Sequence, residues 1–147
     1  MREVIGTHVG SYGIIIRDDR IALIKKARGG YKGKLDLPGG GIEHNETPVE
    51  ALKRELMEEA GVTVTSYELL DAVSKTFKWQ MEEDVIENLH HIGILYTVKV
   101  KEDKLKEVAD GLDSEGADWY NISDLSKSNL SAFTIYSLEK LGYKIRD

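Results

Sequence analysis

Hydrophobic and polar residues between positions 48 and 60 follow the period of an amphipathic helix. One apolar stripe at 100° per residue is formed by Val49, Leu52, Leu56 and Ala60. Thr47 is a suitable N-cap, Pro48 suits the first helical position, and Glu50 can close a capping box. Gly61 stands where a C-terminal cap glycine belongs. The pattern therefore predicts a helix from about Pro48 to about Ala60, with its apolar stripe packed on a sheet.

Strand-like patterns account for most of the remaining chain. Two apolar runs, 14–16 and 21–24, flank Asp18-Asp19-Arg20, which predicts a hairpin. Further extended segments are expected at 9–17, 35–37, 62–64, 67–73, 89–100 and 119–120. We interpret the polar, acidic stretch 79–88 as a loop or the end of a hairpin. Helical spacing over 132–141, with Gly142 as its stop, predicts a second helix.

Strands and helices alternate loosely along the chain, which favours an α/β (α+β) fold. A mixed sheet with helices on both faces is the expected architecture. At 147 residues the chain is near the commonest domain size, so residues 1–147 are expected to form one domain.

The predicted helix carries an unusual concentration of acid directly behind a glycine-rich loop. Glu55, Glu58 and Glu59 cluster on one flank, because residues three and four apart are neighbours on a helix. Like charges at that spacing cost roughly 0.2–0.5 kcal/mol each on an exposed helix. A solvated acidic face, partly paired with Lys53 and Arg54, is the ordinary alternative. The favoured interpretation is that Mg²⁺, or Mn²⁺, neutralises these carboxylates and faces a phosphate, since hard cations take oxygen ligands.

The segment LPGGGIEHNETPVEALKRELMEEAGV resembles the Nudix box of the Nudix hydrolase superfamily (MutT-like), and every specified position is filled. These positions are Gly40, Glu46, Arg54-Glu55-Leu56, Glu58-Glu59 and Gly61-Val62. The resemblance implies an α/β/α sandwich with a central mixed sheet. It also implies a Mg²⁺-dependent pyrophosphohydrolase that splits a nucleoside diphosphate linked to another group, or a nucleoside triphosphate, and releases a nucleoside monophosphate.

The resemblance also suggests roles for individual residues. The carbonyl of Gly39 is expected to join the three helix glutamates as a metal ligand. Arg54 is expected to pair with Glu46 and orient the catalytic carboxylates. The general base stays open between Glu55 and Glu58.

Several members of the family use instead a carboxylate from a loop well after the box. Here Glu115 is the candidate for that later base, with Asp113 and Asp118 as rivals in the segment before Trp119. Each of these three residues is also a typical solvated loop acid.

Residues that could bind the substrate are more widely spread. Gly40 and Gly41 allow close approach of the backbone, and Arg28 lies on a loop that could reach phosphate. Phe77 and Trp79 could stack on a base or could seal the sheet edge.

The markers of particular Nudix subfamilies are missing. Subfamilies acting on ADP-ribose often have a proline some 15 residues past the box, where this chain has Lys75-Thr76-Phe77-Lys78. Subfamilies acting on dinucleoside polyphosphates often have a tyrosine slightly later, where Trp79-Gln80 stand. No subfamily is therefore favoured. His8, His90 and His91 lack matched ligand spacing and are interpreted as structural rather than zinc-binding.

Composition restricts the remaining function classes. The net charge of −6 argues against general nucleic-acid binding, and no stretch of 18 apolar residues suggests a membrane span. A cytoplasmic protein with a small-molecule partner is expected, and the oligomeric state is left open, a homodimer included. The alternative function is a catalytically weak nucleotide-sensing module. Prenyl diphosphate isomerisation on the same scaffold normally uses a cysteine, and the chain has none.

Overall fold

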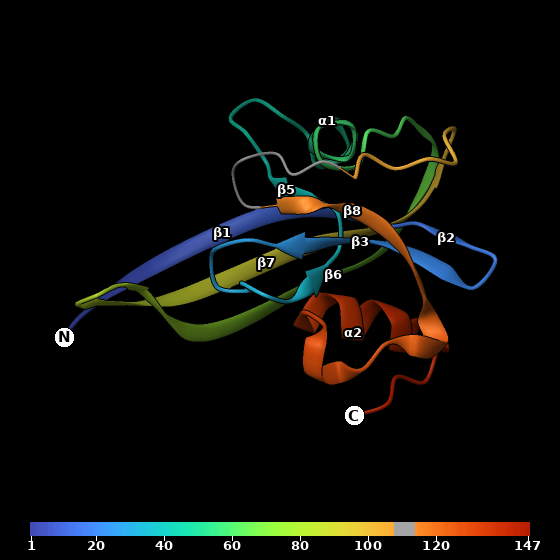
Figure 1. The fold of residues 1–147 in the computed structure, drawn as a ribbon. Coiled ribbons are helices and arrows are strands. Elements are labelled where there is room, and N and C mark those ends of the chain that lie inside the picture. The colour runs from blue at the N-terminus through green and yellow to red at the C-terminus, as the bar shows by residue number, and fades with distance from the viewer. Residues whose placement is uncertain (108–113) are drawn as a thin grey trace.

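The computed structural model describes residues 1–107 and 114–147, in which two α-helices flank two four-stranded sheets (Figure 1). The strands are β1 Arg2–Ile14, β2 Ile16–Arg17, β3 Arg20–Lys26, β4 Leu35–Asp36, β5 Gly39–Gly41, β6 Val64–Glu82, β7 Val85–Val100 and β8 Ser114–Asn121. The helices are α1 Pro48–Ala60 and α2 Ala132–Lys140, with short 3₁₀ turns at Ile122–Asp124 and Lys127–Asn129. Neither α-helix is long and apolar enough to cross a membrane.

Helix α1 has the boundaries and caps that its sequence predicts. The Thr47 hydroxyl accepts a hydrogen bond from the Glu50 N–H at 3.1 Å, and the Glu50 carboxylate accepts one from the Thr47 N–H at 2.9 Å. Gly61 ends the helix in the left-handed conformation, with φ of 68°. The predicted capping box and C-cap are both confirmed, so local sequence alone fixes where the acidic helix begins and ends.

The larger sheet has the strand order β5-β1-β7-β6 and is mixed, as predicted. Strands β1 and β7 run parallel, whereas β1 pairs with β5 and β6 pairs with β7 in antiparallel fashion. The second sheet joins β2, β3, β4 and β8. Its predicted hairpin is confirmed, with Asp18 and Asp19 at positive φ in the turn between β2 and β3.

Apolar side chains form two layers, one beneath each helix. Leu52 and Leu56 of α1 pack with Val98 of β7 on one side. Phe133 and Leu138 of α2 belong to a second cluster on the other side. Figure 1 shows α1 and α2 on opposite sides of the sheets, which confirms the prediction of helices on both faces.

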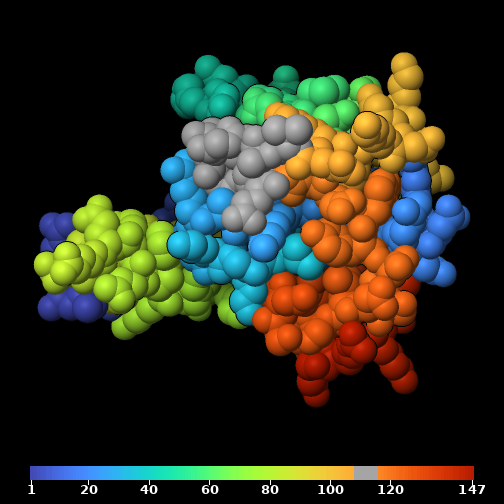
Figure 2. Space-filling view, in the orientation of Figure 1, coloured from blue at the N-terminus to red at the C-terminus, as the bar shows by residue number. Residues whose placement is uncertain are grey.

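Three strands extend further than their hydrophobic pattern predicts. Strand β1 begins at Arg2 rather than near Val9, and β6 and β7 continue to a tight connection at Glu83-Asp84. Residues 2–8, 75–82 and 85–91 of these strands form a projection that we call the arm, which stands out from the body in Figure 2. The acidic stretch 79–88 is thus the end of a hairpin. Its polar composition fits a ribbon that is open to solvent at its edges.

Candidate active site

One face of the arm, the β3–β4 loop, strand β5 and a flank of α1 enclose a cleft of about 1380 Å³. The predicted site residues that line it are Arg28, Gly39, Gly40, Gly41, Glu55, Glu58, Glu59 and Trp79. The cleft therefore brings the glycine–glutamate motif of residues 40–62 next to residues that are distant in the chain.

Arg54 is the centre of the polar network on the α1 side. Its guanidinium binds both carboxylate oxygens of Glu46, at 2.6 and 2.9 Å, and donates to the carbonyl oxygen of Gly41 at 3.0 Å. It also donates to Glu55 at 2.8 Å and Glu58 at 3.3 Å. The predicted pairing of Arg54 with Glu46 is confirmed. One arginine thus ties α1 to the glycine strand and to the loop that precedes the helix.

This network keeps Arg54 and Glu46 ionised. The hydrogen bond from Arg54, followed by one from the backbone at Glu43, lowers the pKa of Glu46 to about 2. The same contact with Glu46 raises the pKa of Arg54 above its ordinary value. The pair therefore keeps its opposite charges over the whole physiological pH range.

The glycines of β5 leave room for carboxylates and for strand β1. Glu59 is buried, with 8% of its surface exposed, and accepts a hydrogen bond from the Gly39 N–H at 2.8 Å. A Cβ atom on Gly40 would lie 2.7 Å from a carboxylate oxygen of Glu55, and one on Gly39 would lie 2.1 Å from the Ser11 carbonyl oxygen. A side chain at Gly40 would therefore collide with the Glu55 carboxylate, and one at Gly39 would collide with the backbone of β1.

The donor set at this end of the cleft has the chemistry of a hard-cation site. The side chain of Glu55 is 16% exposed and that of Glu58 is 58% exposed, and both turn oxygen atoms toward Arg54. Within residues 1–107 and 114–147, no three histidine or acidic side chains already converge as a metal cluster. Glu55, Glu58, Glu59 and the Gly39 carbonyl supply only oxygen donors, so the set fits Mg²⁺ or Mn²⁺ better than a soft metal.

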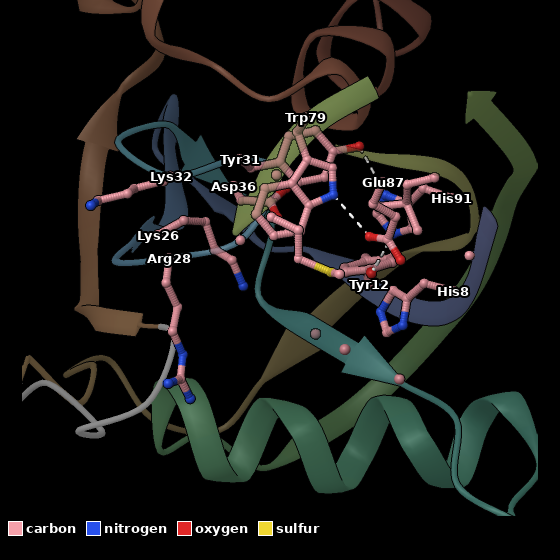
Figure 3. Close-up of a pocket in the computed structure, with 18 of the residues that line it drawn as sticks. His8, Tyr12, Lys26, Arg28, Tyr31, Lys32, Asp36, Trp79, Glu87 and His91 are labelled. Carbon is pink, nitrogen blue, oxygen red and sulfur yellow. Dashed lines mark hydrogen bonds between the residues drawn. The ribbon is translucent and has the colours of Figure 1, made fainter. Parts of the chain in front are cut away.

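Cationic side chains share the cleft with these carboxylates. Lys26, Arg28, Lys32 and Lys106 all contribute to its lining. In Figure 3 the Arg28 side chain points toward α1, and the Lys106 ammonium donates to the Glu58 carbonyl oxygen at 3.1 Å. Mixed charge of this kind suits a polyanion that is bound partly through metal ions.

A buried histidine joins two tyrosines on the floor of the cleft. The His91 ring lies 2.7 Å from the Tyr12 hydroxyl through Nε2 and 2.8 Å from the Tyr31 hydroxyl through Nδ1. Burial, reinforced by His8 and Lys26, lowers the pKa of His91 to about 4. The imidazole is therefore neutral at pH 7 and has one donor and one acceptor nitrogen, so only one tyrosine donates to it.

The arm supplies the far end of the cleft. The Trp79 indole N–H donates to the Glu87 carboxylate at 2.9 Å, as Figure 3 shows, and both residues line the cleft. Phe77 is not among the described residues that line the cleft. Its ring lies 5.2 Å from that of Tyr31 and would contact a Cβ atom on Gly30, so it packs against the β3–β4 loop.

The acidic candidates near position 115 are only partly placed. Asp118, which the sequence assigned to a loop, lies in strand β8, is exposed and accepts the N–H of Trp119. Glu115 belongs to the same strand by its backbone, and its side chain lies outside the described set, as does the whole of Asp113.

Sequence reasoning did not assign several lining residues to the site, among them Tyr12, Tyr31, Asp36, Glu87 and His91. A usable signal exists in β7, where Glu87, Leu89 and His91 recur at the two-residue period of one strand face. Tyr31 carries no such signal, because it belongs to a loop whose path depends on contact with the arm.

The chain is similar in sequence to proteins that are named as pyrophosphatases or diphosphatases. It is 34% identical over 115 residues to an ADP-ribose pyrophosphatase of Methanocaldococcus jannaschii, covering 78% of this chain and 62% of the relative. It is 48% identical over 54 residues to an 8-oxo-dGTP diphosphatase of Proteus vulgaris, covering 37% of this chain and 46% of the relative. The chain thus spans less than two thirds of the length of either of these two relatives.

Solved structures and a family model agree with the fold. The MutT NUDIX hydrolase from Burkholderia pseudomallei superposes with a TM-score of 0.75 at 27% identity, covering 92% of this chain and 98% of that chain. The model of the NUDIX domain matches residues 7–141, which include the whole glycine–glutamate motif and most of the cleft. The chain therefore belongs to the NUDIX domain family.

Proposed function

We propose that this chain is a Mg²⁺-dependent pyrophosphohydrolase. Its substrate is a nucleoside diphosphate linked to another group, or a nucleoside triphosphate, and one product is a nucleoside monophosphate. The observation that carries the proposal is the Arg54 network, which holds Glu55 and Glu58 at the edge of a cleft that also contains lysine and arginine side chains.

Glu55, Glu58, Glu59 and the Gly39 carbonyl would hold the metal ion. When bound, the ion neutralises phosphate charge and lowers the pKa of a bound water. Arg54 is a positioning residue, since it fixes the glutamates against the glycine strand through Gly41. The hydrogen bond from Gly39 to Glu59 keeps that buried carboxylate oriented. Lys26 and Arg28 would bind the phosphate oxygens that the metal leaves exposed.

We assign the proton acceptor for the attacking water to the α1 end of the cleft, where the metal ion would bind. Glu55 or Glu58 can take this role, because each is a carboxylate at the cleft edge. Glu115 remains the candidate for a base supplied by a later segment.

The family and the relatives' names support the reaction class more strongly than the substrate. One relative is named for ADP-ribose and the other for 8-oxo-dGTP. These substrates share a nucleoside diphosphate and differ in what is attached to it. The diphosphate is thus the part of the substrate that the shared motif is expected to recognise.

A substrate screen with Mg²⁺ tests the proposal. The purified protein is incubated with nucleotide sugars, ADP-ribose, dinucleoside polyphosphates and nucleoside triphosphates, and the products are separated by chromatography. We expect a nucleoside monophosphate from at least one of them. Nucleotide binding without any product would contradict the proposal and favour a nucleotide-sensing module.

Glu58→Gln sharpens the test, because it removes a ligand charge from a half-exposed helix position without removing volume. We expect loss of Mg²⁺-dependent turnover by about 10³-fold or more, with an unchanged unfolding midpoint. Glu139→Gln on α2 makes the same charge change far from the cleft and should keep full activity. Wild-type turnover in Glu58→Gln would overturn Glu58 as a metal ligand.

A further inference from the structure

A carboxylate lies at the end of the cleft opposite to the glutamates of α1. We propose that Glu87, oriented by Trp79, is a specificity-determining residue that selects a guanine-type base over adenine. This inference rests on the proposed function, since it concerns the base of the nucleotide whose diphosphate lies near α1.

Strand register places Glu87 on the floor of the cleft. Glu87 is paired with Val4 of β1 on one side and with Trp79 of β6 on the other. Since side chains alternate along a strand, Glu87, Leu89 and His91 share one face, and all three line the cleft. The same register brings Gly6 and His8 of β1 onto this face.

Gly6 gives the Glu87 carboxylate its position. A Cβ atom on Gly6 would lie 2.1 Å from Glu87 Oε2. Because Gly6 pairs with Leu89 rather than with Glu87, the carboxylate must lean from its own register position toward the interior of the cleft. The Trp79 indole holds the other oxygen, Oε1, at 2.9 Å. The hydrogen bond from Trp79 and the space left above Gly6 thus hold the carboxylate at the wall of the cleft.

The distance along β1 matches an extended nucleotide. Gly10 of β1 pairs with Gly41 of β5, and the preceding residue, Gly40, lies against the Glu55 carboxylate. Gly10 therefore marks the α1 end of the cleft along β1. From Gly10 to Gly6 the strand rises about 13 Å, at about 3.3 Å per residue. Phosphates near Glu55 would therefore leave the ribose to cross the middle of the cleft and bring the base near Trp79 and Glu87.

The cations beside the glutamates of α1 favour this orientation of the ligand. Arg28 points toward α1 in Figure 3, and Lys106 contacts Glu58, so two of the cations lie with the metal-binding carboxylates. In the described part of the chain Glu87 forms no ion pair, and its hydrogen-bond partner is the neutral indole of Trp79. A carboxylate without a cation repels phosphate, so the arm end is suited to the base.

The chemistry of the carboxylate then selects among bases. An ionised carboxylate accepts hydrogen bonds and donates none, and each oxygen can accept more than one. Guanine presents two adjacent donors, N1–H and the 2-amino group, which can bind both oxygens in parallel. Adenine presents one amino donor beside the N1 acceptor, and two facing acceptors are unfavourable. A carboxylate that offers only acceptors therefore favours the base with two adjacent donors, since adenine would leave one carboxylate oxygen facing the lone pair of its N1.

Comparison of GTP, ITP and ATP with Mg²⁺ tests the inference, because ITP keeps the N1–H and lacks the 2-amino group. We expect kcat/KM for GTP to exceed that for ATP by about 10²-fold, with ITP between them. Glu87→Gln keeps the shape and an oxygen for Trp79. It should lower kcat/KM for GTP by about 10-fold or more and leave that for ATP unchanged or higher. Glu82→Gln, on the exposed tip of the arm, is the control and should change none of the three.

Equal kcat/KM for GTP and ATP in the wild type would overturn the inference. So would an equal loss for both nucleotides in Glu87→Gln, which would make Glu87 only a support for Trp79. If no nucleotide is hydrolysed, the proposed function fails, and calorimetric titration of GDP and ADP decides this inference separately. A preference for GDP that Glu87→Gln removes supports it, and equal affinities overturn it.

Discussion

The two ends of the cleft are built in opposite ways. At the α1 end, the glycine strand and the acidic helix come from one continuous segment, 39–61, and are joined by Arg54 and by the hydrogen bond from Gly39 to Glu59. At the arm end, Tyr31, Glu87 and His91 come from a loop and a strand that meet only in the folded protein. The first end presents charge and backbone, which suits the diphosphate of the proposed substrate, and the second presents rings and one carboxylate.

This difference separates the part of the site that would meet the diphosphate common to all substrates from the part that would meet the variable remainder of the substrate. A diphosphate is the same in every substrate of the class, and a short segment with local caps can hold the residues that meet it. The rest of the substrate varies, and the surface that meets it depends on how long β6 and β7 are and on where the β3–β4 loop packs. We therefore expect mutations at the α1 end to affect all substrates and mutations in the arm to affect them selectively.

The largest stability effect is expected at the glycine strand. Gly39 has φ of 142°, and its Cβ position lies 2.1 Å from the Ser11 carbonyl oxygen and 2.7 Å from the Tyr12 Cα. Both neighbours are backbone atoms of β1, so Gly39→Ala must separate β5 from β1. We expect the free energy of unfolding to fall by at least about 3 kcal/mol, measured by urea titration with tryptophan fluorescence.

Gly33→Ala is the matched control for this change. Gly33 also has positive φ, of 83°, but no atom lies within 4 Å of its Cβ position. Backbone strain alone should cost about 1–2 kcal/mol there. Equal losses for the two variants would show that the close approach of β1 and β5 contributes nothing to stability.

The α1 end was also the part of the fold that the sequence predicted well. Caps, helix boundaries and the Arg54–Glu46 pair all follow from contacts between residues at most eight positions apart. The mixed sheet and the helices on both faces followed from the order of apolar runs and from the family resemblance.

The arm could not be predicted because its strands are stabilised by long-range pairing. Arg2 of β1 pairs with Val85 of β7, which lies far along the chain, whereas the local pattern of 79–88 is merely polar. The same reason hides the contact of Tyr31 with His91, which joins residues 60 positions apart. The order and direction of the strands determine such contacts, and the hydrophobic period of a single segment does not encode that order.

At His91, where the arm joins the body, we expect a change in the free energy of unfolding that is intermediate in size and depends on pH. The pKa of His91 is lowered to about 4 by burial, from 6.5 in the unfolded chain. Between these values the unfolded state binds a proton and the native state does not, so stability falls as the pH falls from about 6.5 to about 4. Complete titration should remove about 3 kcal/mol from the free energy of unfolding.

Urea titrations of wild type and His91→Phe at pH 7, 6, 5 and 4 measure this contribution. The difference between the two proteins should shrink as the pH falls, because the variant has no imidazole to protonate. His90→Phe removes the exposed neighbouring histidine and should keep the wild-type pH profile. A parallel decline of His91→Phe and wild type would mean that His91 is as readily protonated in the folded protein as in the unfolded chain.

The smallest effect is expected at the cap of α1, where the contact is local and exposed. The Thr47 hydroxyl accepts one backbone N–H, that of Glu50, at 3.1 Å. Thr47→Ala should lower the free energy of unfolding by about 1 kcal/mol, and Thr47→Ser, which keeps the hydroxyl, should restore most of it.

Amide hydrogen exchange in the Thr47→Ala variant then compares the two ends of the cleft directly. In Thr47→Ala, amide hydrogens should exchange faster than in wild type only in the first turn of α1, and exchange in the arm should be unchanged. Faster exchange in β6 and β7 of Thr47→Ala would show that the two ends are energetically coupled, which their separate construction does not predict.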